Sequence, residues 1–488
     1  MQLNELKGID YIEMVRQRKI TVEQVIIDIF NQIDRVDEKL KAYLRINRKG
    51  ALEDAKRIDQ KIKNNSKVPP LAGLPVAIKD IICTKGIETN CASKILKGFV
   101  PPYDATVIRK IKNAGAIIIG KTNMDEFGMG SSNENSAFQV TVNPWDMTRV
   151  PGGSSGGSAV SVAADEALMA LGTDTGGSIR LPASFCGVVG MKPTYGRVSR
   201  YGVIAYASSL DQVGTLTKDI KDTALMMNVI CGHDEMDSTS ADIPVPDFFD
   251  SCREGIKDLK FAIPREYFKQ GLNSEVKDSV MKAINVISEL GGKVEEVSLP
   301  NIEYALPAYY LIAMAEASSN LAKYDGVQYG LRTGGSNNLE DMYRKTRSIG
   351  FGPEVIRRIM LGTYALSSGY YDAYYLKAQK VRTLIKKDFD NVFKKFDIIL
   401  SPTSPVPAFK IGEKINDPLT MYLTDVYTMP VNMAGLPGLS INCGFTVKDT
   451  LPIGLQIIGR AFEEEKILRV AYNFESHFGK TTSRKPTI

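Results

Sequence analysis

Histidine is nearly absent from this chain of 488 residues, which contains only His233 and His477. His233 lies in a polar stretch, Gly-His-Asp-Glu-Met-Asp, that is typical of a surface loop, and His477 lies in a helical segment near the C-terminus. Neither stands in a motif for a metal ligand or a catalytic base. A serine enzyme of this composition would therefore need a proton acceptor other than histidine.

Paired cysteines, long apolar runs and a large excess of charge are also missing. The six cysteines are scattered with no Cys-x-x-Cys pair, which favours reduced thiols in a cytoplasmic protein and gives no zinc motif. No apolar run approaches the ~20 residues of a membrane span, and residues 1–10 have no signal-peptide pattern. The net charge of +5 is too small to indicate nucleic-acid binding by itself.

What is present fits a large α/β enzyme. Hydrophobic residues make up 43% of the chain and charged residues 24%, as in ordinary soluble globular proteins. Strand-like and helical patterns alternate to the end of the chain, which predicts one α/β/α sandwich with a central mixed sheet. We expect residues 1–70 to form an N-terminal helical layer packed on a core of residues 71–488. Within that core, about 303–395 is expected to be a mostly helical insertion that contributes to the substrate pocket.

Capping and periodicity place several elements. Thr21 and Gln24 form a capping box, and the apolar residues after them predict a helix that runs to about Tyr43. Further helices are expected at 51–62, 106–114, 276–290 and 463–478, with largely helical regions at 303–325 and 354–395 separated by the polar loop 332–338. Strands are expected at 74–82, 116–119, 260–264, 397–400, 437–442 and 452–458.

The chain is organised around two glycine-serine loops that flank one alanine-rich segment. The loops are Pro151–Ser158 and Gly172–Arg180, and the segment between them predicts a short helix capped by Ser158. Glycines let main-chain N–H groups turn inward without a steric penalty, and hydroxyls can then lie beside a nest of donors. This layout suits a serine nucleophile with a main-chain oxyanion hole. Flexible linkers are longer and more repetitive, so the linker alternative is weaker.

A lysine interrupts the apolar strand expected at 74–82. Lys79 stands among Val, Ala and Ile, and lysine is rarely fully buried without a reason. Complete burial would lower the pKa of its ammonium from about 10.4 by as much as 3–5 units and leave a neutral amine able to act as a base. The alternative is a side chain whose stem is covered while its ammonium reaches solvent.

Two shorter motif matches fail on their structural context. Gly115–Thr122 fits the phosphate-loop pattern GxxxxGK[ST], but its middle residues are the expected strand and no helix is expected at Lys121. Gly152–Gly156 fits G-x-S-x-G, the nucleophile elbow, which requires a strand directly before it. The preceding residues 143–151 are polar and broken by two prolines, so we reject both matches.

Taken together, these residues resemble the amidase signature family over nearly the whole chain. The resemblance rests on Gly152–Ser158, Gly176–Ser178 and the upstream Pro-Val-Ala-Ile-Lys-Asp around Lys79. Within the family, the sequence is most similar to the A subunits of glutamyl-tRNA(Gln) amidotransferases. Four further segments carry that likeness: Asn123–Phe127, Ser209–Val213, Ala365–Tyr375 and Leu419–Tyr422.

The resemblance implies a Ser-cisSer-Lys triad. Ser178 would be the nucleophile, Ser154 a relay serine after a cis peptide bond, and Lys79 the base. The main-chain donors of the oxyanion hole would be those of Thr175, Gly176 and Gly177. These implied roles agree with the shortage of histidine and with the glycine-rich second loop.

The resemblance also implies how glutamine would be held. Arg358 would bind its α-carboxylate and Asp425 its α-amine, with Tyr309 and Ser131 nearby. A guanidinium fork suits a carboxylate and an aspartate suits an ammonium. From the sequence alone, Arg358 and Asp425 fit solvated surface positions at least as well.

The implied activity is hydrolysis of glutamine to glutamate and ammonia. The ammonia would serve the ATP-dependent conversion of Glu-tRNA(Gln) to Gln-tRNA(Gln) in a cytoplasmic heterotrimer. In that complex a B subunit would use ATP and Mg²⁺ and bind most of the tRNA, and a small C subunit would bridge the two. This chain would hold no metal or cofactor. The alternatives are a stand-alone amidase for other small amides and a non-catalytic scaffold.

Overall fold

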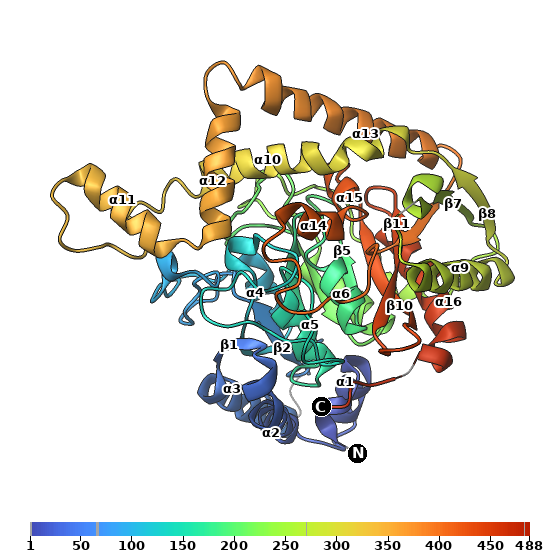
Figure 1. Ribbon diagram of the computed structural model, residues 1–488. Coiled ribbons are helices and arrows are strands. Elements are labelled where there is room, and N and C mark those ends of the chain that lie inside the picture. The colour runs from blue at the N-terminus through green and yellow to red at the C-terminus, as the bar shows by residue number, and fades with distance from the viewer. Residues whose placement is uncertain (1, 65–67, 270, 483) are drawn as a thin grey trace.

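In the computed structural model, which describes residues 2–64, 68–269, 271–482 and 484–488, eleven strands join into one mixed sheet (Figure 1). The strands are β1 Tyr43–Ile46, β2 Pro75–Lys79, β3 Ile117–Thr122, β4 Met169–Asp174, β5 Val189–Lys192, β6 Gln212–Thr217, β7 Lys260–Pro264, β8 Lys293–Val297, β9 Ile398–Pro402, β10 Gly438–Phe445 and β11 Pro452–Gly459. Their order is β1-β3-β2-β4-β6-β5-β10-β11-β9-β7-β8. Strands β2, β3 and β4 are parallel, as are β7, β8 and β9, and the remaining pairs are antiparallel. The predicted α/β fold with a mixed sheet is confirmed.

Helices pack around this sheet. The α-helices are α1 Gly8–Arg16, α2 Val22–Leu40, α3 Arg48–Lys63, α4 Thr106–Asn113, α5 Gly156–Ala163, α6 Arg180–Cys186, α7 Ile220–Ile230, α8 Phe248–Ser251, α9 Ser274–Glu289, α10 Ala305–Asn320, α11 Leu339–Gly350, α12 Pro353–Leu366, α13 Lys377–Phe393, α14 Pro418–Tyr422, α15 Met429–Met433 and α16 Glu464–Thr482. Short 3-10 turns are η1 Leu3–Glu5, η2 Lys94–Leu96, η3 Glu126–Gly128, η4 Arg265–Phe268, η5 Pro300–Tyr304 and η7 Leu423–Asp425, and η6 Asp372–Leu376 is a π-helical turn. No helix in the described part of the chain is long and apolar enough to cross a membrane.

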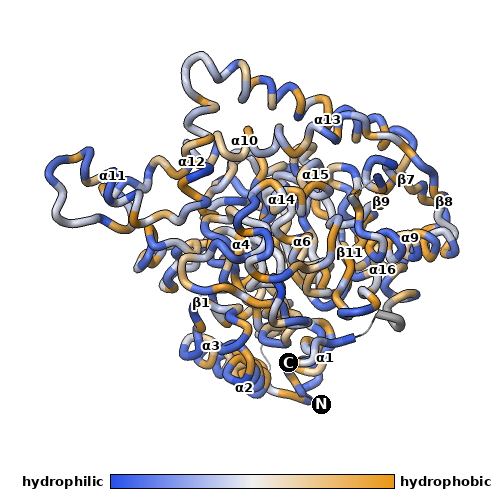
Figure 2. Tube along the Cα trace, viewed as in Figure 1, coloured by the Kyte–Doolittle hydropathy of each residue, from blue (hydrophilic) through white to orange (hydrophobic). Residues whose placement is uncertain are grey.

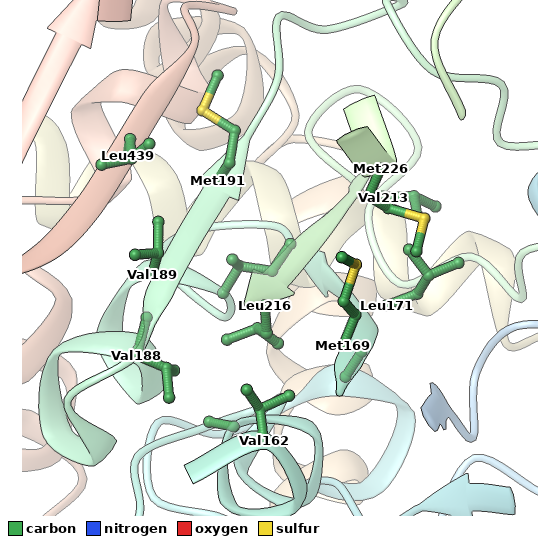
Figure 3. Packing of buried hydrophobic residues seen from close by; sticks show 14 of the residues in the cluster. Val162, Met169, Leu171, Val188, Val189, Met191, Val213, Leu216, Met226 and Leu439 are labelled. Carbon is green, nitrogen blue, oxygen red and sulfur yellow. The ribbon is translucent and has the colours of Figure 1, made fainter. Parts of the chain in front are cut away.

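The core lies where the central strands meet their helices. Figure 3 shows Met169 and Leu171 of β4 beside the neighbouring strand β6, with Met226 of α7 above them. Leu216 of β6 points to the other face of the sheet, and Val162 of α5 lies below it. Every residue of β11 is buried, so both faces of the sheet are covered at that strand. In Figure 2 the hydrophobic colour gathers in this interior, while the protruding α11 segment is mostly hydrophilic or neutral.

Strand pairing brings the two chemically interesting loops together. Strand β2 pairs in parallel with β4, with Ile78 opposite Leu171. The carboxyl ends of parallel strands meet at one edge of a sheet, so Lys79 at the end of β2 lies beside Thr173 near the end of β4. Helix α5 begins at Gly156, directly after the first glycine-serine loop.

The N-terminal segment contributes a strand as well as helices. The predicted capping box is present, because the Thr21 hydroxyl accepts the Gln24 N–H and the Gln24 side chain accepts the Thr21 N–H. The helix expected to reach Tyr43 ends earlier, at Leu40, because Lys41 takes a left-handed conformation. Tyr43 then starts β1, which pairs with β3. The division of the chain at residue 70 stays a prediction.

The prediction that Ser158 caps the short helix is wrong. Helix α5 starts three residues earlier than a cap at Ser158 would require, with Ser155 at the N-cap position, so Ser158 lies inside the helix. Its hydroxyl is 2.7 Å from that of Thr122 and donates to the carbonyl of Leu171 at 3.1 Å. Ser158 therefore ties α5 to β3 and β4. The first turn of α5 contains Gly156 and Gly157. A Cβ at these positions would lie 2.7 Å from Asn133 Nδ2 and 2.4 Å from the Ala42 carbonyl oxygen, so a larger residue would not fit.

Both rejected motifs have the structural context that we expected. Gly120 and Lys121 of the phosphate-loop match lie inside β3, and Lys121 is fully buried. Within residues 123–155, all of which are described, no strand precedes Gly152. The chain therefore reaches the first glycine-serine loop without the strand that a nucleophile elbow requires.

The helical region between β8 and β9 contains one helix more than expected. We predicted helices at 303–325 and 354–395 separated by a polar loop, and α10, α12 and α13 occupy those ranges. Helix α11 lies in the separating segment and projects from the body of the molecule at the left of Figure 1. Most of this helix is in contact with solvent, because only Met342, Thr346 and Gly350 of its residues are buried.

Gly362 of α12 tests how closely this region is packed. A Cβ at Gly362 would lie 1.9 Å from the main-chain oxygen of Met314 in α10, which cannot move aside without shifting the helix. We expect Gly362→Ala to lower the free energy of unfolding by about 1–3 kcal/mol, although alanine normally favours a helix. Chemical denaturation of the purified variant measures this.

The matched control is Gly50→Ala in α3. There the added Cβ would meet only the end of the Asn47 side chain, which can move aside by giving up its hydrogen bond to the Ile118 carbonyl. That loss offsets the helix propensity of alanine, so we expect this variant to stay within ~1 kcal/mol of the parent. Equal destabilisation of the two variants would mean that α10 and α12 are not packed as described.

Candidate active site

Lys79 is the buried group around which the candidate site forms. It is the last residue of β2, and its side chain has no exposed surface. Its Nζ lies 2.8 Å from the hydroxyl oxygens of Ser154, Ser155 and Thr173 and 3.2 Å from the Thr173 carbonyl oxygen. The alternative in which the ammonium reaches solvent is therefore wrong.

The surroundings of Lys79 favour its uncharged form. Burial lowers the pKa of the Lys79 ammonium to about 7, although the charges of Asp125, Asp174 and Asp211 raise it in part. Among the described residues, no carboxylate lies within ion-pair distance of Nζ. At neutral pH a large fraction of the molecules therefore carries a free amine at this position.

Ser154 is one of the hydrogen-bond partners of the Lys79 amine. The peptide bond between Gly153 and Ser154 is cis, as the resemblance implied. The Gly153 N–H donates to the Ser131 carbonyl at 2.8 Å, and a Cβ at Gly153 would lie 2.0 Å from Asp125 Oδ2. Glycine is therefore the residue that fits at this point of the loop.

Ser178 lies on the second loop, in contact with the first. The main-chain N–H of Ser155 donates to the Ser178 carbonyl at 3.1 Å, which joins the two loops. Ser178 is 8% exposed, and among the described residues its hydroxyl has no hydrogen-bond partner. The hydroxyls of Ser154 and Ser178 therefore do not bond to each other in this structure. Such bonds are often long in free enzymes and tighten when substrate binds.

A buried ion pair frames the second loop. Asp174 accepts hydrogen bonds from the Gly177 N–H at 2.8 Å and the Ile179 N–H at 3.2 Å, and it pairs with Arg180 Nε at 3.0 Å. Burial would raise the pKa of Asp174, but the charge and hydrogen bonds of Arg180 lower it to about 2. From the sequence we assigned no role to these two residues, although an Asp and an Arg at the ends of a Gly-Gly-Ser loop could have indicated one.

Three main-chain donors of this loop are free to hold an anion. Among the described residues, the N–H groups of Thr175, Gly176 and Ser178 have no acceptor. The expectation for Gly177 disagrees with the geometry, because its N–H already donates to Asp174. The N–H of Ser178 itself was not among the donors expected from the sequence. Thr428 fixes the loop from outside by donating its hydroxyl to the Gly176 carbonyl at 2.6 Å.

Asp425, Ser131 and Tyr309 all lie beside this loop. A Cβ at Gly177 would be 3.0 Å from Asp425 Oδ1, and one at Gly176 would be 2.5 Å from the Tyr309 hydroxyl oxygen. The Ser131 hydroxyl donates to Asp425 Oδ2, while Oδ1 is buried and has no partner in the described part of the chain. Burial raises the pKa of Asp425 to about 8. Its free oxygen suits a hydrogen-bond donor such as an ammonium, and the positive charge of a bound ammonium would favour the ionised form of Asp425.

Arg358 is held in an aromatic cage and not on a solvated helix face. It is 2% exposed, and its guanidinium carbon lies over the rings of Tyr206, Tyr310 and Tyr422 at 5.7, 5.3 and 5.4 Å from their centres. Its Nη1 donates to the Tyr206 hydroxyl at 2.7 Å and its Nε to Glu354 Oε1 at 2.8 Å. Its Nη2 makes no hydrogen bond to any described residue, so part of the fork remains available.

A cavity of about 550 Å³ opens next to this cage. It lies between α12, the loop after η3 and the segment at 414–422, and its lining includes Arg358, Tyr422, Glu126 and Glu134. Lys79, Ser154 and Ser178 do not line it. The cavity therefore lies on the Arg358 side of the site, and the two serines are not part of its wall.

The residues that the sequence excluded from the chemistry stay outside the site. His233 and His477 are exposed on the surface, and all six cysteines are buried as free thiols. Among the described residues, no group of three or more His, Cys, Asp or Glu side chains is arranged to hold a metal ion.

Comparison with known proteins gives close relatives over the full length. Residues 24–468 match the model of the Amidase family. The chain is 56% identical to the glutamyl-tRNA(Gln) amidotransferase A subunit of Desulforamulus reducens over 99% of both chains, and 58% identical to that of Moorella thermoacetica over 97% of both. The crystal structure of the glutamyl-tRNA(Gln) amidotransferase A subunit from Thermotoga maritima is 44% identical, covers 98% of this chain and 95% of its own, and aligns with a TM-score of 0.80.

The ion pair under the second loop generates a stability prediction. Asp174→Asn would leave the Arg180 guanidinium, which has no exposed surface, without its counter-charge. We expect the free energy of unfolding to fall by about 3–5 kcal/mol. Chemical denaturation measures the change. Glu340→Gln serves as the control, because its pair with Arg344 is 81% and 76% exposed and should change stability by less than ~1 kcal/mol. Similar effects of both variants would contradict a framing role for Asp174.

Proposed function

Because the chain belongs to the amidase family, we propose that it hydrolyses glutamine as the A subunit of a glutamyl-tRNA(Gln) amidotransferase. The observation that carries the proposal is the buried Lys79 amine, 2.8 Å from the Ser154 hydroxyl and without an ion-pair partner among the described residues. Identities of 56% and 58% to proteins of that name over nearly the full length support the choice of substrate.

The reaction starts with proton transfer toward Lys79. Neutral Lys79 accepts the Ser154 proton while Ser154 accepts that of Ser178, and Ser178 Oγ attacks the side-chain amide carbon of glutamine. The carbonyl oxygen gains negative charge and is held by the free main-chain N–H groups of Thr175, Gly176 and Ser178. Preorganised donors of this kind are typically worth about 3–4 kcal/mol each in the transition state.

Collapse of the tetrahedral intermediate breaks the carbon–nitrogen bond. Protonated Lys79, through Ser154, returns the proton to the leaving nitrogen, and ammonia departs from a γ-glutamyl ester on Ser178. Water then attacks the ester with the same amine as base, which releases glutamate and restores the Ser178 hydroxyl. The base ends each cycle neutral, so no other proton acceptor is needed.

Recognition of glutamine falls to the two charged groups above the loop. The free Nη2 edge of Arg358 suits the α-carboxylate, and the unpartnered Oδ1 of Asp425 suits the α-ammonium. Tyr309 closes over Gly176, and Ser131 orients Asp425. This pair of opposite charges favours an amino acid over the apolar or aromatic amides that a stand-alone amidase of the same family would take.

The ammonia released by this chain is used by a partner subunit. The relatives are named as A subunits, which implies further subunits. We assign to this chain a cytoplasmic heterotrimer in which a B subunit uses ATP and Mg²⁺ to activate Glu-tRNA(Gln) and a C subunit bridges the two. The catalytic residues assigned here need no cofactor in this chain.

Ser178→Ala tests the nucleophile. In the complex purified with its partners, we expect glutamine hydrolysis to fall by at least about a thousandfold, because no covalent intermediate can form. Ser184→Ala is the matched control, since Ser184 is also buried on the neighbouring α6 and its hydroxyl takes part in no assigned step. Release of glutamate is the measurement. Retention of more than about a tenth of the parent rate by Ser178→Ala would exclude this nucleophile.

The pKa of Lys79 sets the pH dependence of kcat. Because the base must be uncharged, kcat should rise about tenfold per pH unit below pH 7 and level off above it. Initial rates at saturating glutamine between about pH 5.5 and 9 measure this limb without the contribution of Asp425 to substrate binding. A kcat that is constant or falls as the pH rises from 6 to 8 would mean that Lys79 does not act as the base.

A further inference from the structure

Glu126 is a buried carboxyl group to which the mechanism assigns no step. It is 1% exposed, and among the described residues no cation lies within ion-pair distance of it. Its Oε2 accepts the main-chain N–H of Gly352 at 2.8 Å, and its Oε1 accepts the Ser93 hydroxyl. The Ser93 oxygen also lies 3.2 Å from the carbonyl oxygen of Gly350. Glu126 and Ser93 together therefore hold the joint between α11 and α12.

This joint has no other anchor of comparable kind in the described part of the chain. Gly352 is the N-cap residue of α12 and supplies no side chain to cap it. The Glu126 carboxyl group, 226 positions away in the chain, accepts the main-chain N–H of this N-cap residue, which is the bond that the N3 Glu side chain makes in a capping box. A negative charge is favourable at this end of a helix. A Cβ at Gly352 would lie 2.5 Å from Glu126 Oε2, so only glycine leaves room for the carboxyl group to reach this main-chain N–H.

Helix α12 carries the group proposed to bind the substrate carboxylate. Glu354 in its first turn accepts the Nε–H of Arg358 and the hydroxyl of Tyr422, both at 2.8 Å. A shift of the first turn therefore moves Glu354, the Arg358 guanidinium and the stacked ring of Tyr422 together. The position of the Arg358 fork depends on where the N-terminus of α12 is held.

The residue before Glu126 holds the other half of the site. Asp125 donates its main-chain N–H to the Ser154 carbonyl at 3.3 Å, and its carboxylate accepts the N–H groups of Asn133 and Asn135 at 2.9 and 3.0 Å. These bonds fix the turn that carries Ser131 and the loop that carries Ser154. Two consecutive residues thus contact both halves of the site: Asp125 bonds to Ser154 through its main-chain N–H, and Glu126 bonds to the N-terminus of α12 through its carboxyl group.

We propose that Glu126 is a positioning residue for substrate recognition, which sets Arg358 at the right distance from Ser178 by anchoring the N-terminus of α12. The inference rests on the proposed function, because it needs glutamine as the substrate. Glu126 does not touch the reacting atoms. Its loss should therefore weaken the binding of the α-carboxylate and leave the chemistry of the triad in place.

Glu126→Gln in the complete complex tests the proposal. The Gln oxygen can accept from only one of the two donors, and its NH₂ group fits beside Ser93 only if that hydroxyl turns to the Gly350 carbonyl 3.2 Å away. The anchor is therefore weakened and not lost, so we expect the KM for glutamine to rise about fivefold while kcat stays within about twofold. Ser93→Ala, which removes one of the two donors and keeps the charge of Glu126, should raise KM by a smaller factor.

The matched control is Glu266→Gln. Glu266 makes the same pair of bonds, accepting the Ser298 hydroxyl at 2.6 Å and the Leu299 N–H at 3.0 Å, and it also pairs with Arg265 at 3.5 Å. None of its partners has a role in the proposed reaction. A general loss of stability would appear in both variants. We expect KM and kcat of Glu266→Gln to stay within about twofold of the parent values.

A glutamine analogue separates positioning of Arg358 from other effects. Glutamine with its α-carboxylate converted to an amide cannot use the charge of Arg358, so its inhibition constant against glutamine should be the same in Glu126→Gln as in the parent. An equal rise of that constant and of the KM would overturn the proposal, as would a Glu126→Gln variant indistinguishable from Glu266→Gln. If Ser178→Ala retains activity, the proposed function fails first; if it is inactive, these outcomes concern Glu126 alone.

Discussion

Removal of one amine from water is the constraint on which the rest of the structure depends. Lys79 ends a strand whose five residues are all buried, and no carboxylate in the described part of the chain lies close enough to pair with it. Burial therefore favours the uncharged form of its nitrogen. The hydroxyl groups of Ser154, Ser155 and Thr173 form hydrogen bonds with this nitrogen, and because they are neutral they do not stabilise its ammonium form as a carboxylate would. A nearby aspartate at ion-pair distance would stabilise the ammonium and remove the base.

The two glycine-serine loops are closely packed at their glycines. Side chains cannot be added at Gly153, Gly176 or Gly177 without meeting Asp125, Tyr309 or Thr428. Asp174, which pairs with Arg180, accepts the N–H groups of Gly177 and Ile179, and those of Thr175, Gly176 and Ser178 stay free among the described residues. A buried ion pair contributes little net stability on its own, but it orients main-chain donors that a flexible loop would turn toward water.

Recognition is assembled from parts that lie far apart in the chain. Four separate segments supply Arg358, Asp425, Ser131 and Tyr309. Arg358 lies in the aromatic cage, Asp425 and Tyr309 lie beside the second loop, and Ser131 bonds to Asp425 and to Gly153 of the first loop. The helical region between β8 and β9 brings two of them, which explains why a helical insertion belongs to the same functional unit as the sheet. Asp125 and Glu126 connect this region to the serine loops. The residues proposed to bind glutamine and those proposed to react with it are therefore positioned by the same short segment.

The sequence by itself determined the α/β fold, the glycine-serine loops, the burial expected for Lys79 and the family. These depend on local periodicity and on residue types that are rare in their sequence context, such as a lysine within an apolar strand. It could not predict that Gly177 donates to Asp174, that the Ser178 N–H is free, or that α5 starts before Ser158, since loop hydrogen bonds depend on neighbours from other strands. The sequence pattern allowed Arg358 and Asp425 to be surface residues as readily as site residues. Only the tertiary structure decided that, because burial is a property of what packs against a side chain, and the rings around Arg358 and the loop beside Asp425 lie far from them in the chain.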